Sequence, residues 1–475
     1  MEIKDLNSYA ELEVLNLQAK EKQLAHKSQD ELRESALRYL QDDKRIKAVT
    51  IAFTDLEGRF HALDYDKKFF IKSYDNLTFD GSSIRGFSQV KESDLRLQMD
   101  WGAFRFLPAD VFGPGKVLIF GLINDRGQAT YPADFRGLLR DLTNQLYSKE
   151  KQVMSVAVEL EGFLFAGLNA EQEYTSRTGF KFASLGGYYN TLPQAPLRLF
   201  IDKFAEVQRA MGFENEKDHP EVAPAQFELN YSHCDALISA DQVQLYKLIA
   251  RQVAANMGMT ACFLPKPVAD INGNGMHTNM SLSKGGKNLF YAKDGQDGLS
   301  ELGWSFVDRI LNNANDLCLL LNPSVNAYRR LDPHYEAPNQ IKSSAIDRTS
   351  MIRIPLANEK SARVEVRSVA PDCNPYLTFY TLFKTGMEGP MTEQLDSESR
   401  RTRTRFLPGN IHDAIRHFKG SAWMTQLLGE DVQTKFVDLK QMSADRCPKL
   451  LGTMVKTEEI LFHHDVTNQY IWGRF

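Results

Sequence analysis

The 475-residue chain contains little cysteine and no long apolar run. Its cysteines are odd in number and form no CxxC pair, which excludes a disulfide framework and a thiolate zinc site. The five are Cys234, Cys262, Cys318, Cys373 and Cys447. Because no stretch of about 18 apolar residues occurs, we expect no membrane-spanning helix and no membrane partner. The N-terminus lacks a basic segment followed by an apolar one, so we predict no signal peptide and a cytoplasmic protein with reduced thiols.

An excess of charge of one sign is also absent, because 57 Lys and Arg residues are balanced by 61 Asp and Glu residues, for a net charge of −4. This balance excludes a protein that binds nucleic acid through a large positive field, and we expect no nucleic-acid partner. No GxxxxGK[ST] loop is present, so the chain is not a P-loop enzyme. The apolar fraction of 43% and the charged fraction of 25% are typical of globular domains.

Three regions follow one another along the chain. Residues 1–43 are polar with a weak apolar stripe and predict one or two surface helices. Residues 44–130 carry alternating strand patterns, including KAVTIAFTDLEGRFHALDYD, which predicts a β-hairpin. In residues 131–475 strands are separated by long helices. We therefore predict an α+β fold, with a helical extension, a small β domain and a large catalytic domain over these three ranges.

Carboxylates occur on apolar strand patterns. Glu159 and Glu161 in VAVELEGF point to one face, because side chains alternate along a strand. Two neighbouring carboxylates repel each other, and their burial is costly unless a cation is present. The alternative is an edge strand whose polar face meets water. From this segment alone the two interpretations are equally good.

The pattern repeats elsewhere in the chain. HPEVAPAQFELN offers Glu221 and Glu228, ARVEVRSV offers Glu365, and GNGMHTNMSL offers His277. Carboxylates with a single imidazole suit Mg²⁺ or Mn²⁺. Arginines beside Glu365 favour an anionic substrate, with phosphate as the leading candidate. Two divalent ions bridging phosphates would suit phosphoryl transfer.

The segment NAYRRLDPHYEAPNQIKSSAIDRTSMIRIP concentrates further charged side chains among prolines. Its functional candidates are Arg330, Glu336, Arg348 and Arg353. A loop stiffened by two prolines can close over a site and place Glu336 in it. A surface loop with exposed charges is the commoner alternative. Arg353 fits that alternative poorly, because it lies within the apolar run MIRIP.

The ordered motifs resemble those of the glutamine synthetase family of the bacterial type, closely over residues 45–380. They are FDGSS (79–83), VELEGFLF (158–165), GGYY (186–189), EVAPAQFE (221–228), PKP with NGNGMHTNMS (265–281), NAYRRLDPHYEAP (326–338), RTSMIRIP (348–355), and RVEVRS with NPYL (363–377). The resemblance implies a β-grasp domain before an α/β catalytic domain with a curved antiparallel sheet. It also implies a homo-oligomer of two stacked hexameric rings, whose active sites lie between subunits.

The resemblance assigns roles to residues by motif position. It implies a first metal site of Glu161, Glu221 and Glu228, and a second of Glu159, His277 and Glu365, for two or more Mg²⁺ or Mn²⁺ ions. It implies substrate binding by Asn272, Gly273, His277, Arg330, Arg367 and Ser83. For ATP, the co-substrate, it implies Tyr188, Ser281, Lys360 and Arg363, with Arg348 and Arg353 facing the γ-phosphate. Asp80, from a neighbouring subunit, would take a proton from ammonium, and Glu336 would close the site.

The implied reaction is ATP-dependent ligation of ammonia to the γ-carboxylate of glutamate through γ-glutamyl phosphate. A γ-glutamylamide ligase that uses an organic amine is one alternative, against which the intact FDGSS motif argues. A non-catalytic ring protein is the other, and a scaffold has no reason to keep repelling carboxylates.

Several positions depart from the family pattern. Pro220 and Asn279 stand where a second histidine is common, and Asp347 stands where asparagine is common. The chain also has an N-terminal extension. The segment DSESRRTRTRFLPG lacks the family's nucleotidylated tyrosine, so we predict no control by adenylylation there. Its arginines (Arg400, Arg401, Arg403 and Arg405) are interpreted as a solvated loop in preference to an anion or chain contact.

Overall fold

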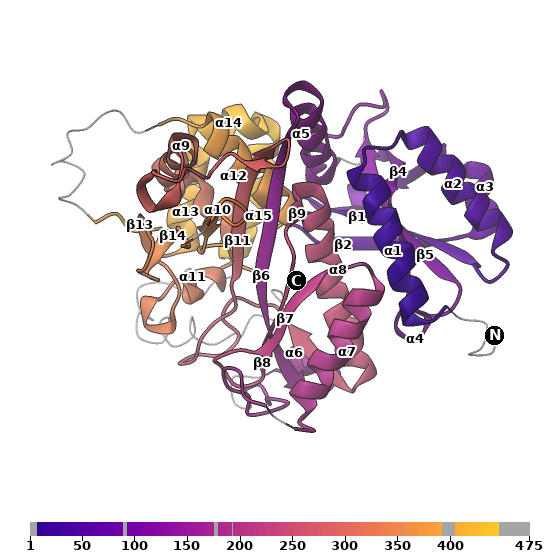
Figure 1. The fold of residues 1–475 in the computed structure, drawn as a ribbon, viewed down its shortest axis with the longest axis horizontal. Coiled ribbons are helices and arrows are strands. Elements are labelled where there is room, and N and C mark those ends of the chain that lie inside the picture. Colours follow the sequence, from indigo (N-terminus) through magenta and orange to yellow (C-terminus); the bar gives the residue numbers. More distant parts are fainter. Residues whose placement is uncertain are drawn as a thin grey trace.

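The protein is described by a computed structural model over residues 7–88, 93–174, 179–191, 193–356, 358–391 and 404–445. It contains two β-sheets, of five and ten strands. The predicted α+β class is confirmed, with a β-grasp domain and a second sheet that curls into a half-barrel. Figure 1 shows the smaller sheet on one side of the molecule and the larger sheet, with most of the helices, on the other.

The first sheet has the strand order β2-β1-β5-β4-β3. Its strands are β1 (Ala48–Thr54), β2 (Phe60–Asp66), β3 (Leu77–Asp80), β4 (Asp94–Phe106) and β5 (Lys116–Asn124). The predicted hairpin is confirmed, because β1 and β2 pair antiparallel from Ala48–Asp66 to Thr54–Phe60. The short helices α3 (Lys67–Ser73) and α4 (Ala109–Phe112) connect strands of this sheet.

Two helices precede this sheet, as the sequence predicts: α1 (Tyr9–Leu24) and α2 (Gln29–Asp42). The helix α1 packs through polar side chains that the apolar stripe did not indicate. Asn16 is buried, and its amide nitrogen donates to the carbonyl oxygens of Phe106 and Ala210. Lys20 is also buried and lies 2.5 Å from a carboxylate oxygen of Glu214. The extension is therefore attached to both sheet-bearing parts of its own chain.

The main path of the ten-stranded sheet has the order β13-β14-β15-β11-β6-β8-β7. Its strands are β6 (Gln152–Ala166), β7 (Asn215–Pro220), β8 (Gln226–Tyr231), β9 (Cys234–Asp235), β10 (Met259–Cys262), β11 (Met276–Lys284), β12 (Lys287–Asn288), β13 (Gln340–Ser344), β14 (Ser350–Arg353) and β15 (Val364–Val366). All its pairs are antiparallel except β13 with β14. The long strand β6 pairs with β11 on one side and with β8 on the other. The edge-strand interpretation of Glu159 and Glu161 is therefore wrong.

Most helices follow or flank the larger sheet (Figure 1). They are α5 (Phe135–Glu150), α6 (Ala170–Glu173), α7 (Pro196–Ala210), α8 (Ala236–Asn256), α9 (Glu301–Asn312), α10 (Ala314–Leu321), α11 (Ala327–Arg330), α12 (Pro375–Glu388), α13 (Ile411–Gly420), α14 (Ala422–Leu428) and α15 (Glu430–Asp445). Of these, α5, α7 and α8 pack directly against strands of the sheet. Alternation along β6 buries Met154, Val156, Val158 and Leu160 against this helical layer. The opposite face of β6 carries Ser155, Glu159 and Glu161.

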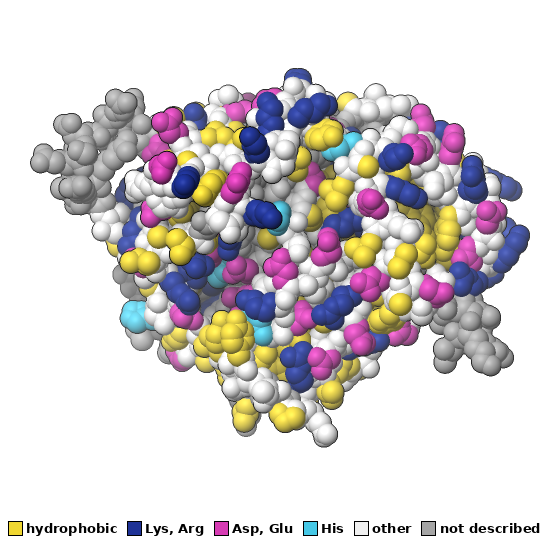
Figure 2. Space-filling model, viewed as in Figure 1, with side chains coloured by type: hydrophobic (Ala, Val, Ile, Leu, Met, Phe, Trp, Pro, Cys, Tyr) yellow, Lys and Arg dark blue, Asp and Glu magenta, His cyan; other side chains and the backbone are white. Residues whose placement is uncertain are grey.

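Two expectations from composition, on membrane-spanning helices and on cysteine thiols, can be compared with the described residues. None of their helices has both the length and the apolar character that a membrane crossing needs. Cys234, Cys262, Cys318 and Cys373 are buried free thiols, as predicted, while Cys447 lies outside the described residues. On the face drawn in Figure 2, Lys and Arg side chains alternate with Asp and Glu side chains, which agrees with the balanced composition.

Candidate active site

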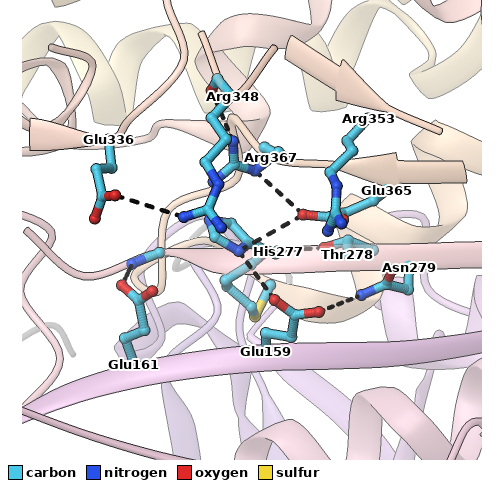
Figure 3. A network of polar contacts seen from close by, with 12 residues as sticks. Glu159, Glu161, His277, Thr278, Asn279, Glu336, Arg348, Arg353, Glu365 and Arg367 are labelled. Atoms are coloured by element: carbon cyan, nitrogen blue, oxygen red, sulfur yellow. Dashed lines mark hydrogen bonds and ion pairs between the residues drawn. The ribbon is translucent and has the colours of Figure 1, made fainter. Parts of the chain in front are cut away.

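Strand register brings the predicted carboxylates together. Glu159 on β6 is paired with His277 on β11, and Glu161 on β6 is paired with Glu228 on β8. Figure 3 shows Glu159 and Glu161 projecting from β6 on the side where His277 lies. Because neighbours across a sheet lie about 5 Å apart, this register alone builds a compact acidic cluster.

One group of possible metal ligands consists of Glu159, His277 and Glu365. His277 Nδ1 lies 3.2 Å from a carboxylate oxygen of Glu159 and 3.8 Å from one of Glu365. Asn279 donates to the other Glu159 oxygen at 3.2 Å. Asn279 thus stands beside the cluster in the position where the family pattern commonly has a histidine.

The second group consists of His219, Glu221 and Glu228. His219 Nδ1 lies 3.5 Å from Glu221, and its Nε2 lies 3.7 Å from Glu228. The sequence interpretation did not single out His219. The spacing His219–Glu221 was the available signal, since residues two apart on a strand share a face. Glu161 was expected in this group. It is paired with Glu228 across β6 and β8, and its carboxylate accepts a hydrogen bond from the Gly275 amide at 2.6 Å.

The electrostatics of the cluster indicate a place for cations. Burial, and next the charge of Glu161, raises the pKa of Glu221 to about 8. Burial, with the charges of three neighbouring glutamates, raises the pKa of Glu228 well above its ordinary value. Burial would also raise the pKa of Glu159, but the hydrogen bond and charge of His277 outweigh it and lower that pKa to about 2. The carboxylates Glu161, Glu221 and Glu228 oppose one another's ionisation without a counter-charge, and together with the imidazoles they fit hard divalent cations.

Arginines surround the cluster on its other side. The Nη1 of Arg353 lies 3.0 Å from Glu365, and the Nε of Arg367 lies 3.2 Å from the other Glu365 oxygen. Arg330 is buried and donates to the Arg367 carbonyl at 2.9 Å. Its buried Nη1 has no hydrogen-bond partner among the described residues. An unpaired buried guanidinium nitrogen in a cavity wall is suited to an anionic ligand.

The loop that carries Asn272 and the segment that carries Glu336 meet beside the cluster. Glu336 accepts a hydrogen bond from the Asn272 amide at 3.0 Å and lies 3.5 Å from Arg348 Nη1 (Figure 3). Its φ of 63° is left-handed, which is uncommon for a residue with a side chain. Beside it, the Tyr335 ring lies over the Lys266 ammonium at 3.7 Å. Strained backbone of this kind persists only where surrounding contacts hold it.

These residues line two adjoining cavities. The larger has a volume of about 500 Å³ and contains both candidate metal groups except His219, together with Tyr188, Asn272, Gly273, Arg330, Glu336, Arg348, Arg353, Arg363 and Arg367. The smaller has a volume of about 380 Å³, and its lining includes Ser281, Lys360 and Arg363. The residues that line both cavities are Glu159, Lys217 and Arg363.

Two predicted site residues lie elsewhere. Asp80 and Ser83 belong to the five-stranded domain and line neither cavity of their own chain. Asp80 is exposed and accepts hydrogen bonds from the hydroxyls of Ser82 and Ser83. Those bonds lower its pKa. Of the arginine run, Arg400, Arg401 and Arg403 lie outside the described residues, while Arg405 is exposed.

The chain joins a small five-stranded domain to a curled sheet. The sheet carries two carboxylate–histidine groups beside an arginine wall formed by Arg330, Arg353 and Arg367. This combination defines a metal-dependent enzyme that acts on anionic substrates. The family model described as Glutamine synthetase, catalytic domain matches residues 132–451, and the one described as Glutamine synthetase, beta-Grasp domain matches residues 45–121. The chain belongs to the glutamine synthetase family.

Individual relatives agree with this membership. A glutamine synthetase of Thermus thermophilus is 34% identical over 429 residues, which cover 85% of this chain and 93% of that protein. The structure of Plasmodium falciparum glutamine synthetase superposes with a TM-score of 0.76 at 20% identity, covering 89% of this chain and 97% of that one, and shows the shared fold. A GmaS–ADP complex superposes with a TM-score of 0.75 at 25% identity and covers 89% of this chain and 99% of that one.

Proposed function

We propose that this protein ligates ammonia to the γ-carboxylate of L-glutamate with consumption of ATP, giving glutamine, ADP and phosphate. The observation that carries the proposal is that both candidate metal groups, apart from His219, line one cavity together with the arginines Arg330, Arg353 and Arg367. Curated relatives named glutamine synthetase support the same reaction. The protein is therefore a glutamate–ammonia ligase, and we propose a cytoplasmic location, which its free cysteines support.

The two ligand groups are proposed to hold Mg²⁺ or Mn²⁺. Glu159, His277 and Glu365 form one site, and Glu221 and Glu228, with Glu161 or His219, form the other. When bound there, divalent ions neutralise phosphate oxygens and so favour phosphoryl transfer. All donors are carboxylate oxygens or imidazole nitrogens, which fits these hard cations better than softer ones.

The chemistry requires that the glutamate side chain first become a good acyl donor. A carboxylate is a poor one, because its leaving group would be oxide, whereas an acyl phosphate loses phosphate readily. We propose that Arg348 and Arg353 bind the γ-phosphate during transfer, with charge stabilisation as their role. Asn272, Gly273, His277, Arg330 and Arg367 are proposed to bind glutamate. The buried, unpaired Nη1 of Arg330 supports this assignment.

The nucleotide is proposed to lie across both cavities. Ser281, Lys360 and Arg363 line the smaller one, and Tyr188 lines the larger one. The solved complex with ADP, at 25% identity, supports a nucleotide in this fold. Such an arrangement would leave the terminal phosphate beside the carboxylates and arginines.

Ammonium becomes nucleophilic only after it loses a proton, so a base is needed near its pocket. We propose that Asp80 and Ser83 reach the site from an adjacent subunit in two stacked hexameric rings. Asp80 is exposed and lines neither cavity of its own chain, which supports a role across an interface. Glu336 is proposed to close the site, because water would hydrolyse the acyl phosphate.

A phosphate-release assay with ATP and glutamate tests the proposal. Ammonia should support both phosphate release and glutamine formation, with one phosphate per amide bond. A panel of primary amines serves as the comparison. Release that requires an organic amine would instead support a γ-glutamylamide ligase, and no release with any amine would support a non-catalytic ring protein.

A further inference from the structure

The two cavities meet at three charged residues, and one of them has no role in the proposed function so far. Glu159, Lys217 and Arg363 line both cavities. A nucleotide that extends from the smaller cavity to the candidate metal groups must pass this junction with its phosphates. The junction therefore has to present positive charge to a polyanion.

Local strand structure places Lys217 there. Lys217 on β7 is paired with Asn230 on β8, and His219, two residues further, is paired with Glu228. The side chains of Lys217 and His219 thus share the face of the sheet that carries the acidic cluster. The β7–β8 register shifts between Asn215 and Lys217, a bulge that changes which side chains face the cavities.

Lys217 is also available to a ligand. Its side chain is exposed, and no carboxylate among the described residues lies within ion-pair distance of its ammonium group. The nearby acids have other partners: Glu216 accepts a hydrogen bond from the Ser232 hydroxyl at 2.8 Å, and Glu159 contacts His277 and Asn279.

Arg363 is the other cation at the junction, and hydrogen bonds within the protein occupy some of its donor groups. Its Nε donates to the Asn279 side chain at 2.8 Å, and its Nη1 donates to the Ser361 carbonyl at 3.1 Å. Only part of its guanidinium therefore remains for phosphate. Lys217 on β7 supplies a second positive charge and further donors as a flexible point cation.

We propose that Lys217 contacts the nucleotide phosphates beyond the α-phosphate as they pass from one cavity to the other. Lys217 and Arg363 approach the phosphates from different strands, β7 and the segment before β15. Lys217 is a positioning residue for the phosphate chain. The inference rests on the proposed nucleotide site but not on the identity of the amine or on turnover.

Equilibrium binding of ADP and AMP to the full-length protein in the presence of Mg²⁺ tests the inference. We expect Lys217→Met to weaken ADP binding about tenfold, as the loss of a charge-assisted contact would, and to leave AMP binding unchanged. Lys217→Arg should restore most of the ADP affinity. Lys284→Met, which removes an exposed lysine on β11 that lines neither cavity, is the matched control.

Three outcomes would overturn the inference: unchanged ADP affinity in Lys217→Met, equal loss for ADP and AMP, or a weaker affinity for Mn²⁺ alone that accounts for the whole loss. The third would make Lys217 a counter-charge of the carboxylates. Lys217→Gln repeats the test if the methionine variant fails to assemble. Because binding needs no turnover, the ADP–AMP contrast still decides the role of Lys217 if glutamate and ammonia prove not to be substrates.

Discussion

At the scale of single residues, the burial of the acidic cluster has a cost in stability. Glu228 is 5% exposed and lies among Glu161, Glu159 and Glu221, and burial is the main reason that its pKa is raised. Without a cation, this side chain must keep a proton or carry an unfavourable charge. The metal-free protein therefore contains a repulsion that a cation bound at the proposed site would relieve.

We predict that Glu228→Gln raises the melting temperature of the metal-free protein by a few degrees. It should also abolish most of the further increase that Mg²⁺ or Mn²⁺ produces in wild type, and lower kcat by about 100-fold or more. Thermal melts with and without metal measure the first two effects, and a phosphate-release assay measures kcat. Glu173→Gln, at an exposed position on α6, is the control and should change none of the three quantities. A variant that still gained the full stabilisation from metal would contradict the assignment of Glu228.

The pH dependence of stability follows from Glu221. Its pKa is raised to about 8 in the fold, mainly by burial and next by the charge of Glu161. Between its unfolded pKa and pH 8, the folded state therefore holds a proton that the unfolded state has lost, so stability falls as pH rises. We predict that the melting temperature of metal-free wild type falls by a few degrees more between pH 6 and 8 than that of Glu221→Gln. Parallel profiles for the two proteins would show that Glu221 does not titrate in this range.

At the scale of elements, the segment around Glu336 depends on contacts from another loop. Lys266 is buried, its ammonium group lies under the Tyr335 ring, and it donates to the Ile271 carbonyl next to Asn272. Burial lowers the pKa of Lys266 to about 8. One cation thereby links the loop that presents Asn272 to the segment that presents Glu336.

We predict that Tyr335→Leu loosens this closure and increases hydrolysis of the acyl phosphate, because a cation–π contact contributes roughly 0.5–2 kcal/mol. The ratio of phosphate released to glutamine formed should rise from about one to several in this variant, since water then competes with ammonia. Tyr335→Phe keeps the ring and should keep the wild-type ratio. Equal ratios in the leucine and phenylalanine variants would count against a role for the ring.

At the scale of the whole molecule, a buried charged network joins the two sheet-bearing parts. Arg136 on α5 makes two hydrogen bonds to Asp241 on α8, at 2.8 and 2.7 Å, and one to Asp100 on β4 at 2.9 Å. The Tyr376 hydroxyl donates to Asp241 at 2.7 Å. These groups line neither candidate cavity, so their contribution is to stability.

We predict that Asp241→Ala destabilises the fold by about 3–5 kcal/mol, because it leaves Arg136 buried beside a single remaining partner. Tyr376→Phe should cost only about 1 kcal/mol, as the loss of one hydrogen bond. Chemical denaturation of both variants measures the difference, and the activity per folded protein should stay near wild type. The opposite order of stability would refute this account of the network.

The proposed ring assembly can be tested by complementation between two variants. Asp80→Asn and Glu161→Gln should each lower activity about 100-fold or more when expressed alone. If Asp80 serves the cavity of a neighbouring subunit, co-expression of the two variants should restore about a quarter of wild-type activity, because random mixing leaves that fraction of interfaces intact. Activity no higher than that of the separate variants would place Asp80 outside the active site or within its own subunit's site.

Much of this protein could be predicted from its sequence, because the informative signals are local. Strand alternation placed Glu159 and Glu161 on one face, the turn Asp55–Gly58 indicated a hairpin, and glycines preceded His277. Gly275 illustrates the reason for such glycines, since a Cβ there would lie 2.5 Å from Arg330 Nη2. The ordered motifs then indicated the family, which the comparisons confirm.

Local periodicity could not identify the partners across strands. It did not show that β6 lies in the sheet interior, that His219 meets Glu221 and Glu228, or that the polar residues Asn16 and Lys20 are buried on α1 beside Leu12. The sequence by itself determined which residues share a face, because backbone geometry repeats every two or 3.6 residues. Only the tertiary structure decided the strand register and the burial of charge, because both depend on packing between segments far apart in the chain.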